Sequence, residues 1–375
     1  MINAEDFLSE FLKLEINHFT GVPDSTLKEW MALLGCKSSL FENRIAANEG
    51  AAIAHAAGYH LATNKLSVVY LQNSGLGNCV SPLTSLTDPE VYSIPLIIVM
   101  GWRGKPGIKD EPQHKKMGAI MINVLDTLDI PHSVLSDNTY KEQIKTAKMI
   151  VEKNLKPYVL IVEPGFFENA TPSKINKKPT LVNRESAIGC IVNSINKDDL
   201  IVSTTGKTSR ELYEICSNHS RGHDNNFYNV GSMGHVSSIG LEIALQRKDK
   251  KVYILDGDGS LIMHMGALST LGYYQPNNLI HIIFDNQSHE STGGQPTTSS
   301  TMDFSEVLLG CNYKIVNNVQ SESELSKILL KERQGLQGLI VKTQVGSRID
   351  LGRPSDTPNT TKKRFMDGLK KNDRR

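Results

Sequence analysis

Cysteine is scarce in this sequence and follows no pattern. The 375 residues contain five cysteines, at positions 36, 79, 190, 216 and 311, without a C-x-x-C pair. An odd number at irregular spacing does not indicate a disulfide framework. The thiols instead fit structural roles in a reducing compartment, and we expect the protein in the cytoplasm.

An excess of charge of one sign is also missing, and so are long apolar runs. The net charge is only +1, which gives the chain no general attraction to nucleic acid or to membrane surfaces. No apolar run approaches the ~20 residues that cross a bilayer. The first residues, Met1 to Phe7, are acidic and amphipathic, unlike a signal peptide. We therefore expect neither nucleic acid nor a membrane as a partner, and any site for an anion must be local.

The first half of the chain alternates helical patterns with apolar runs. Helices are predicted for residues 6–15, for 26–34 with Ser25 as the N-cap, and from Asn48 to about Ala62. Continuous β-branched runs at 66–72, 95–101 and 158–163 indicate buried parallel strands. A polar, glycine-rich loop at 73–78 and a long basic loop at 102–118 connect them. This alternation is typical of an α/β domain, which we place at residues 1–165.

The same organisation returns after a break. Residues 166–181 contain prolines and lysines with little periodicity and are predicted to be a linker. A second domain at 182–375 has predicted strands at 200–204 and 339–343 and helices at 209–216 and 236–246. Its tail, residues 346–375, is rich in lysine and arginine and is predicted to end solvated and partly disordered. The sequence thus predicts an α/β protein with two doubly wound parallel-sheet domains.

Two apolar runs in the second half end in polar residues. The first ends in Gly257-Asp258-Gly259-Ser260 and the second in Asp285-Asn286. Helical periodicity from Leu261 to Tyr274 separates them, so the pattern is strand, glycine-rich turn, helix, strand. Open α/β sheets bind ligands at the carboxyl ends of their strands. Oxygen ligands there, beside glycines that admit phosphate oxygens close to the backbone, predict a site for Mg²⁺ and a diphosphate.

These residues resemble the shared motif of the thiamine-diphosphate-dependent 2-oxo-acid decarboxylases, in which Gly-Asp-Gly is followed by Asn. Two further segments match the family in the same order, Asn48-Glu49-Gly50-Ala51-Ala52 and Gly231-Ser232-Met233-Gly234. The Asn277-Asn278 pair is not the motif asparagine, because it precedes the strand and lies too close to Asp258. The resemblance implies a pyrimidine-binding domain followed by a diphosphate-binding domain, without the middle domain of larger members.

Other segments narrow the resemblance to members that act on acidic substrates. Gly21–Ser25, Trp102–Gly107, Asp110–His114 and Asp285–Gln295 are similar to phosphonopyruvate decarboxylases, with the sulfopyruvate enzymes as near relatives. This implies a small anionic 2-oxo acid as substrate and the conversion of 3-phosphonopyruvate to phosphonoacetaldehyde and CO₂, in phosphonate biosynthesis. It also implies a homodimer or a larger assembly with active sites at the subunit interface.

The resemblance gives roles to the residues of the cofactor site. Glu49 is expected to activate thiamine diphosphate and Met233 to wedge under it. Mg²⁺ is expected to bind Asp258, Asn286 and the backbone carbonyl of Ser288. The remaining cofactor contacts are expected from Gly206, Gly257, Gly259 and Ser260.

Proton transfer and substrate binding are expected mainly from the first domain. The candidates for proton transfer are Asp24 and His114, with His289 and Glu290 in reserve. The basic loop suits an anionic substrate, since arginine can hold phosphonate or sulfonate oxygens through two N–H groups. The candidates for substrate binding are Arg103, Lys105, Lys109 and, if the tail folds back, Arg353.

Other functions fit part of the pattern. A sulfopyruvate decarboxylase would use the same residues, and so would a carboligase that joins the reaction intermediate to a second carbonyl compound. A non-catalytic cofactor-binding protein is disfavoured because Glu49, Asp258 and Asn286 are all present. A dinucleotide oxidoreductase is disfavoured because no G-x-G-x-x-G follows an early strand. Gly206-Lys207-Thr208 resembles the end of a P-loop, but the earlier glycine is missing.

Overall fold

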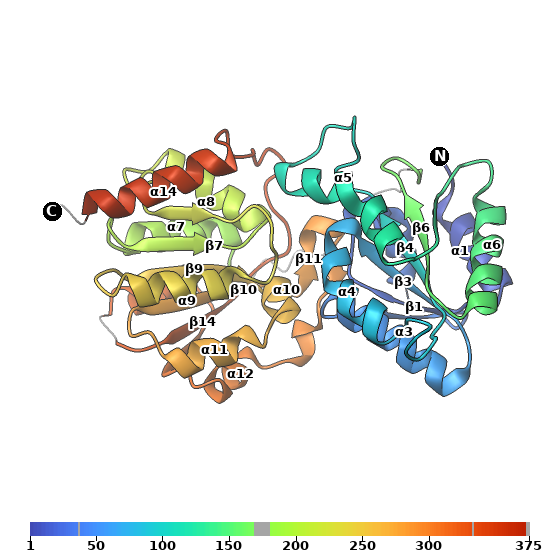
Figure 1. Ribbon diagram of the computed structural model, residues 1–375. Coiled ribbons are helices and arrows are strands. Elements are labelled where there is room, and N and C mark those ends of the chain that lie inside the picture. Colours follow the sequence, from blue (N-terminus) through green and yellow to red (C-terminus); the bar gives the residue numbers. More distant parts are fainter. Residues whose placement is uncertain (37, 169–180, 332–333, 373–375) are drawn as a thin grey trace. The chain divides into compact units, whose positions relative to one another are not determined.

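The chain forms two compact units, which we call the N-terminal and the C-terminal unit. The computed structural model describes residues 1–36, 38–168, 181–331 and 334–372. The two units are Met1–Ser173 and Lys174–Arg375 (Figure 1). The predicted linker at 166–181 lies mostly outside the described residues, so its bounds stay a prediction. Within the described part of the chain, no helix combines the length and the apolar composition that a membrane span requires.

The N-terminal unit is built on a six-stranded parallel sheet. Its strands lie in the order β2-β1-β3-β4-β6-β5. They are β1 (His18–Gly21), β2 (Glu42–Ile45), β3 (Ser67–Gln72), β4 (Ile97–Gly101), β5 (His132–Val134) and β6 (Tyr158–Val162). The buried runs predicted as strands are therefore β3, β4 and β6, in the middle of the sheet, where both faces are covered.

The C-terminal unit repeats this topology. Its main sheet has the order β13-β14-β10-β9-β7-β8, and read from β8 it matches the first sheet strand for strand. The strands are β7 (Leu200–Ser203), β8 (Asn226–Tyr228), β9 (Val252–Gly257), β10 (Leu279–Asp285), β13 (Ile315–Val319) and β14 (Gln337–Lys342). A two-stranded antiparallel sheet pairs β11 (Ser288–His289) with β12 (Gln295–Pro296) directly after β10. The prediction of two doubly wound parallel sheets is confirmed.

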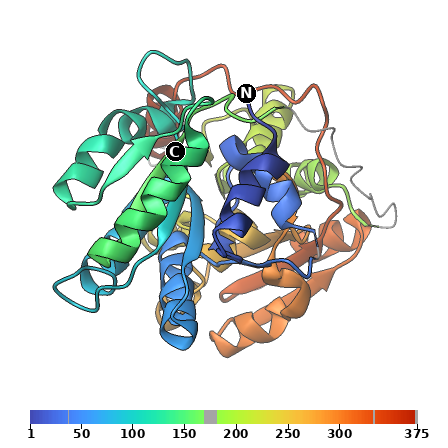
Figure 2. The same cartoon turned by 90° about the vertical axis from the view of Figure 1, so that its right-hand side faces the viewer.

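Helices cover both faces of each sheet (Figures 1 and 2). Those of the N-terminal unit are α1 (Ala4–Lys13), α2 (Lys28–Leu34), α3 (Glu49–Thr63), α4 (Leu76–Ser85), α5 (Pro112–Thr127) and α6 (Tyr140–Asn154). Here α1, α2 and α6 share one apolar core with the sheet, while α3, α4 and α5 share the other. Those of the C-terminal unit are α7 (Arg184–Ser194), α8 (Lys207–Ser217), α9 (Val236–Gln246), α10 (Asp258–Met263), α11 (Ala267–Tyr274), α12 (Phe304–Gly310), α13 (Glu322–Leu329) and α14 (Pro358–Asn372).

The structure corrects several local predictions. The basic loop does not run to residue 118, because Pro112 begins α5, and proline is well suited to the first turn of a helix. Ser25 does not cap a helix; it opens a short 3₁₀ turn, and α2 begins only at Lys28. The helical segment predicted from Leu261 to Tyr274 is two helices, α10 and α11.

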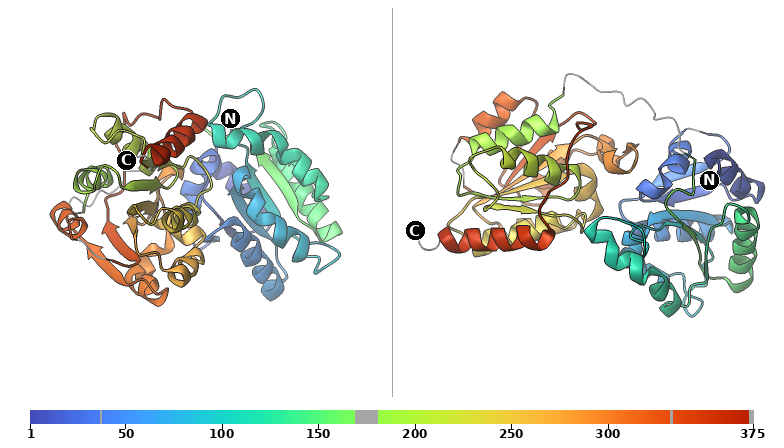
Figure 3. Two further views of the ribbon diagram at one scale, coloured as in Figure 1. Left: turned by 60° about the vertical axis from the view of Figure 1, so that its left-hand side comes forward. Right: turned by 90° about the horizontal axis from the view of Figure 1, so that it is seen from above.

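The tail is also more ordered than predicted. Residues 358–372 form α14, drawn in red along the outside of the C-terminal unit in Figure 3. Phe365 anchors this helix, since its ring lies 5.9 Å from the ring of Phe227. The basic composition of the tail concealed this one buried aromatic contact. The last residues of the predicted disordered end, 373–375, lie outside the described residues.

Asn278, which the sequence analysis set aside as a motif residue, has a structural task. Its Nδ2 lies 3.0, 2.9 and 2.7 Å from the carbonyl oxygens of Ala244, Arg247 and Lys250. The Ala244 oxygen lies in the last turn of α9 and the other two follow the helix, where backbone carbonyls have no partner within the helix. One side-chain amide therefore closes the connection between α9 and β9.

We expect Asn278→Ala to destabilise the C-terminal unit. Three carbonyl oxygens would lose the Asn278 amide as a donor, at a cost of about 1–3 kcal/mol, which lowers Tm by ~2–4 °C for each kcal/mol in a unit of this size. Thermal unfolding followed by circular dichroism measures the change. The matched control is Asn277→Ala, since the Asn277 side chain is exposed. Equal Tm values for the two variants would contradict the assignment.

Candidate active site

Glu49 is the first residue of α3 and is buried within the N-terminal unit. Asn48 starts the helix, because its side chain accepts a hydrogen bond from the Ala51 N–H at 2.9 Å. Glu49 is only 6% exposed, and its Oε2 accepts a hydrogen bond from Asn78 Nδ2 at 2.7 Å. A Cβ at Gly75 would lie 2.3 Å from the Glu49 carboxyl carbon, so only glycine leaves room for it. The predicted cap and the predicted burial of Glu49 are confirmed, and a neutral donor holds its carboxyl group.

Asp24 follows β1 and is fully buried. Its Oδ1 accepts a hydrogen bond from Gln72 Nε2 at 2.7 Å, whereas Oδ2 has no partner among the described residues. Burial raises the pKa of the Asp24 carboxyl, and the hydrogen bond from Gln72 offsets part of this shift. Oδ2 faces the backbone of Gly101, where a Cβ would approach to 1.8 Å. A carboxyl group with a raised pKa and a free oxygen is suited to proton transfer.

Two basic side chains of the loop after β4 form ion pairs within the protein. The Arg103 fork donates to Asp110 through Nε at 2.8 Å and Nη2 at 2.5 Å, and its Nη1 donates to Ser25 Oγ at 2.8 Å. Lys105 pairs with Glu163. Lys109 is exposed. Of the three predicted substrate residues in this loop, Arg103 and Lys105 are therefore held in place before any substrate binds.

Asp110 is the centre around which this loop closes. Besides Arg103, the backbone N–H of Gly104 donates to it at 2.7 Å and that of Glu111 at 2.7 Å. Burial acts to raise the pKa of Asp110, but the donors from Arg103 and Gly104 outweigh it, so the pKa is lowered and the group stays ionised. The carboxylate fixes the fork of Arg103 and leaves one N–H on each terminal nitrogen of that side chain for another acceptor.

His114 lies in the first turn of α5, in contact with this loop. Its backbone carbonyl packs on Gly104, where a Cβ would come within 2.1 Å, and Gly104 has a positive φ of 69°. Burial lowers the pKa of His114, and the charge of Arg103 lowers it further, so the ring is neutral near pH 7. Its Nδ1 is buried and has no partner among the described residues. A neutral imidazole with a free nitrogen can accept or relay a proton.

In the C-terminal unit, the Gly-Asp-Gly segment lies where β9 enters α10. Asp258 is 3% exposed, and its Oδ2 accepts hydrogen bonds from Thr297 Oγ1 at 2.5 Å and Ser299 Oγ at 3.2 Å. Burial raises the pKa of Asp258 to about 6, and the charge of Asp285 adds to the rise. Both hydroxyls bind the same carboxylate oxygen, so neither of them occupies Oδ1. A cation bound there would relieve the electrostatic cost of ionising this group.

Ser260 connects three segments that the sequence analysis treated separately. Its hydroxyl lies 2.9 Å from that of Thr204, which follows β7, and accepts a hydrogen bond from the Gly234 N–H at 3.2 Å. Gly206 has a φ of 90°, so the turn before α8 favours glycine. Met233 is half-buried and belongs to neither apolar core of the unit. The structure thus brings the predicted cofactor residues of this unit to the carboxyl ends of neighbouring strands.

Asn286 follows β10 and has its amide fixed on both sides. Its Oδ1 accepts a hydrogen bond from the Ser288 N–H at 3.0 Å, and its Nδ2 donates to Glu290 Oε2 at 3.2 Å. Ser288 Oγ is buried and has no partner among the described residues, and neither has the side-chain amide of Gln295. Unpartnered polar atoms in a buried place indicate that a polar ligand belongs there.

These observations fit the expected Mg²⁺ and diphosphate. Asp258 offers a carboxylate oxygen, Asn286 an amide oxygen and Ser288 a backbone carbonyl, which are the oxygen ligands that Mg²⁺ prefers. No group of three or more His, Cys, Asp or Glu side chains in the described ranges is arranged to hold a metal. The expected ligand set contains only one such residue, so its metal must keep water and diphosphate oxygens as further ligands.

The two reserve candidates for proton transfer have pKa values that lie further from neutrality than those of an ordinary carboxyl or imidazole group. Glu290 accepts hydrogen bonds from Arg184 at 2.9 Å and Lys207 at 2.9 Å. Burial acts to raise the pKa of Glu290, but these cations outweigh it and lower the pKa to about 2. Burial lowers the pKa of His289 to about 4. Near neutral pH the first stays ionised and has no proton to donate, and the second stays neutral and could act only as an acceptor.

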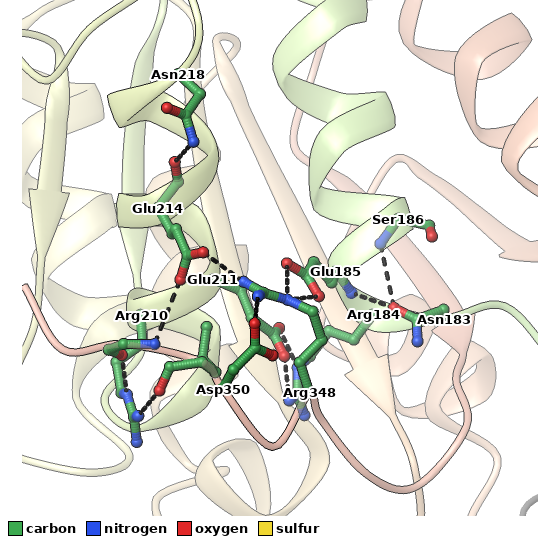
Figure 4. Close-up of polar contacts among 12 residues, drawn as sticks. Asn183, Arg184, Glu185, Ser186, Arg210, Glu211, Glu214, Asn218, Arg348 and Asp350 are labelled. Atoms are coloured by element: carbon green, nitrogen blue, oxygen red, sulfur yellow. Dashed lines mark hydrogen bonds and ion pairs between the residues drawn. The ribbon is translucent and has the colours of Figure 1, made fainter.

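Arg353 lies in a segment that crosses the C-terminal unit beside α7 and α8. Arg348 anchors this segment through Glu185 at 2.8 Å and Glu214 at 2.6 Å, as Figure 4 shows. Arg210 donates to the carbonyl oxygen of Gly352 at 2.7 Å. Arg353 itself is exposed. The tail therefore does fold back, onto its own unit, and the role of Arg353 in substrate binding stays a prediction.

Sequence reasoning missed the side chains that hold the candidate groups. Gln72 and Asn78 border the glycine-rich loop that was predicted to surround a ligand, so their position was a usable signal. Thr297 and Ser299 belong to a run of hydroxyl residues after Gly293-Gly294-Gln295 that was not interpreted. No local signal marked Arg184, because its partner Glu290 is 106 residues away.

Comparison with known proteins gives one consistent result. Residues 2–124 match the N-terminal TPP binding domain of thiamine pyrophosphate enzymes, and residues 204–337 match their C-terminal TPP binding domain. The phosphonopyruvate decarboxylase of Streptomyces viridochromogenes is 35% identical, covering 97% of this chain and 94% of that protein. That of Streptomyces hygroscopicus is 33% identical, covering 98% and 94%. The sulfopyruvate decarboxylase subunit beta of Methanocaldococcus jannaschii is 36% identical but covers 48% of this chain and 94% of its own length. The chain belongs to the thiamine-diphosphate-dependent 2-oxo-acid decarboxylases, as its motifs predicted.

Proposed function

We propose that this protein decarboxylates 3-phosphonopyruvate to phosphonoacetaldehyde and CO₂ with thiamine diphosphate and Mg²⁺, as a step of phosphonate biosynthesis. The similarity to two phosphonopyruvate decarboxylases over nearly the whole chain carries this proposal. The two candidate groups of residues, one in each unit, support it because they contain a match for each cofactor motif. A 2-oxo acid is the substrate type in either case, and the proposal commits to the phosphonate.

The cofactor and the protein divide the chemistry between them. When bound, thiamine diphosphate supplies the electron sink for the electron pair that CO₂ leaves behind. Glu49 would share a proton with the ring nitrogen N1′ of the cofactor, and Asn78 would keep its carboxyl group oriented for this. Asp258, Asn286 and the Ser288 carbonyl would hold the Mg²⁺ that anchors the diphosphate. Met233 would support the bend of the cofactor.

Substrate recognition would use the preformed loop after β4. Arg103 is fixed by Asp110 and Ser25, so its side-chain entropy is lost during folding and not during binding. Its remaining N–H groups and the exposed Lys109 are the donors that a phosphonate would meet. Lys105 would contribute mainly through its pair with Glu163, which holds the loop to the end of β6.

Proton delivery would come from Asp24, with His114 as the second group. Asp24 has a raised pKa and an unpartnered oxygen, and His114 is neutral with an unpartnered nitrogen. A carboxyl group whose pKa is raised toward the working pH can deliver a proton during the reaction. Asp24 would then give its proton to the carbon that loses CO₂.

The protein is proposed to act as a homodimer or a larger assembly in the cytoplasm. Helices α3 and α4 support this, because exposed small residues along them, such as Ala54, Gly58 and Gly77, would let another subunit approach closely. The scattered cysteines agree with a reducing compartment.

The substrate is tested by comparing three 2-oxo acids. With thiamine diphosphate and Mg²⁺ present, CO₂ release should give the highest kcat/KM for phosphonopyruvate, with sulfopyruvate second. Pyruvate lacks the second anion and should be slower by about 10–10²-fold, since one charge-assisted hydrogen bond contributes roughly 1.5–3 kcal/mol. A preference for sulfopyruvate would reassign the substrate, and no turnover of any of them would refute the function.

Glu49→Gln tests the activating group. The amide cannot share a proton as a carboxyl group does, so turnover should fall by about 10²–10⁴-fold. Calorimetry should show thiamine diphosphate binding within about tenfold of wild type, because most of the contacts expected to hold the cofactor are elsewhere. Glu42→Gln, an exposed residue of β2, is the matched control and should keep full activity. An active Glu49→Gln variant would exclude the proposed role.

Asp24→Asn tests the buried acid through its pH dependence. A raised pKa means that the folded protein binds this proton more tightly than the unfolded chain, so ionisation of Asp24 destabilises the fold as pH rises. The variant should therefore exceed wild type in Tm at pH 8, and the difference should shrink as pH falls toward ~4, where the unfolded carboxyl is protonated too. Turnover should fall by at least about 10²-fold. Asp198→Asn, at an exposed site, should show no such pH-dependent difference.

A further inference from the structure

Glu290 stands in the loop after β10 and has every carboxylate oxygen in use. Its Oε1 accepts a hydrogen bond from Lys207 Nζ at 2.9 Å. Its Oε2 accepts one from Arg184 Nη1 at 2.9 Å and another from Asn286 Nδ2 at 3.2 Å. The side chain is 6% exposed. Both oxygens are thus held by fixed donors, and one of these donors is the side chain of Asn286.

The neighbour that matters for the proposed chemistry is Asn286. An amide can be turned by 180° with little change in shape, which exchanges its oxygen and its nitrogen. Here the Ser288 N–H requires an oxygen on one side, and the Glu290 carboxylate requires an N–H on the other. A turned amide would lose both hydrogen bonds. Its N–H groups would then face the Ser288 N–H, and its oxygen would face the Glu290 carboxylate. The observed orientation keeps the second lone pair of Oδ1 free for a cation.

Arg184 in turn fixes Glu290 to the first residues of α7. The guanidinium is 6% exposed and donates to Glu211 through Nε at 2.7 Å and Nη2 at 2.8 Å. Together with Lys207, these side chains form two cations and two carboxylates, so their charges balance. A buried ion network of this kind adds little stability compared with apolar packing, because both signs of charge lose their hydration. The network includes Glu290, which also binds Asn286, so we look for a role of the network in holding the proposed metal ligand.

We propose that Glu290, held by Arg184 and Lys207, is the positioning residue that sets the Asn286 amide oxygen toward Mg²⁺. This inference rests on the proposed function, because it takes Asn286 as the metal ligand. Residues behind a metal ligand usually change metal affinity by about 10–100-fold when they are replaced. The cost of losing Glu290 should therefore appear in the Mg²⁺ requirement, while the rate at saturating Mg²⁺ should change little.

The test measures cofactor binding, not turnover alone. Calorimetry of thiamine diphosphate binding at a series of Mg²⁺ concentrations gives the concentration for half-maximal binding. Glu290→Ala should raise it by about 10–100-fold. Glu290→Gln keeps the size and an oxygen that can accept from Asn286, so its shift should be smaller. High Mg²⁺ should restore turnover in both variants to near the wild-type rate.

Glu185→Gln is the matched control. Glu185 is the next residue of α7 after Arg184, and it pairs with Arg348 and not with Glu290 (Figure 4). This variant should change Tm at most and leave the Mg²⁺ requirement as in wild type. A purely structural Glu290 would likewise lower Tm without shifting the Mg²⁺ requirement, and that result would overturn the inference alone. A wild type that binds no thiamine diphosphate with Mg²⁺ would overturn the proposed function together with it.

Discussion

The carboxyl groups of the two candidate sites are of two kinds, which differ in whether a cation is paired with them. Glu49, Asp24 and Asp258 are held by neutral donors, namely amides and hydroxyls. Asp110, Asp285 and Glu290 are paired with lysine or arginine. A carboxyl group that is buried beside neutral donors lacks a compensating charge, and burial raises the pKa of Asp24 and Asp258. One that is paired with a cation is satisfied and serves as a fixed point. The first kind carries the proposed chemistry, and the second kind keeps the surrounding loops in shape.

Identical strand order in the two units places these groups in corresponding positions. Asp24 follows β1 and Thr204 follows β7, while Gln72 ends β3 and Asp258 follows β9. Both pairs lie where the strand order reverses direction, which is the place at which open α/β sheets bind ligands. Glu49 and Met233 also correspond, because each lies in the connection after the second strand of its unit. The same topology thus carries the group proposed to activate the cofactor in the first unit and the groups proposed to anchor it in the second.

Patterns that are local in the sequence were predictable, and partnerships between distant segments were not. Asn48 followed by alanines predicted the start and the burial of α3, and the apolar runs predicted the central strands. The position of Asp258 and Asn286 at strand ends followed from the same reasoning. The pairing of Arg103 with Asp110 was not predicted, although both lie in one loop. The composition of a loop gives the number of its charges but does not show which of them are in contact. The helix in the tail was not predicted, because the many lysines suggested a solvated segment. The packing of a single aromatic residue, Phe365, against the unit is not visible in the composition.

Each unit encloses its own apolar cores, and this has a consequence for how such enzymes are encoded. Each sheet is covered by helices of its own unit, so neither unit depends on the other for the apolar contacts of its cores. A related sulfopyruvate decarboxylase subunit matches only about half of this chain while nearly filling its own length. The main effect of joining both units in one polypeptide is then to fix their ratio at one to one. A single gene guarantees that every activating half is made with one anchoring half, which two independently expressed chains must achieve by balanced synthesis.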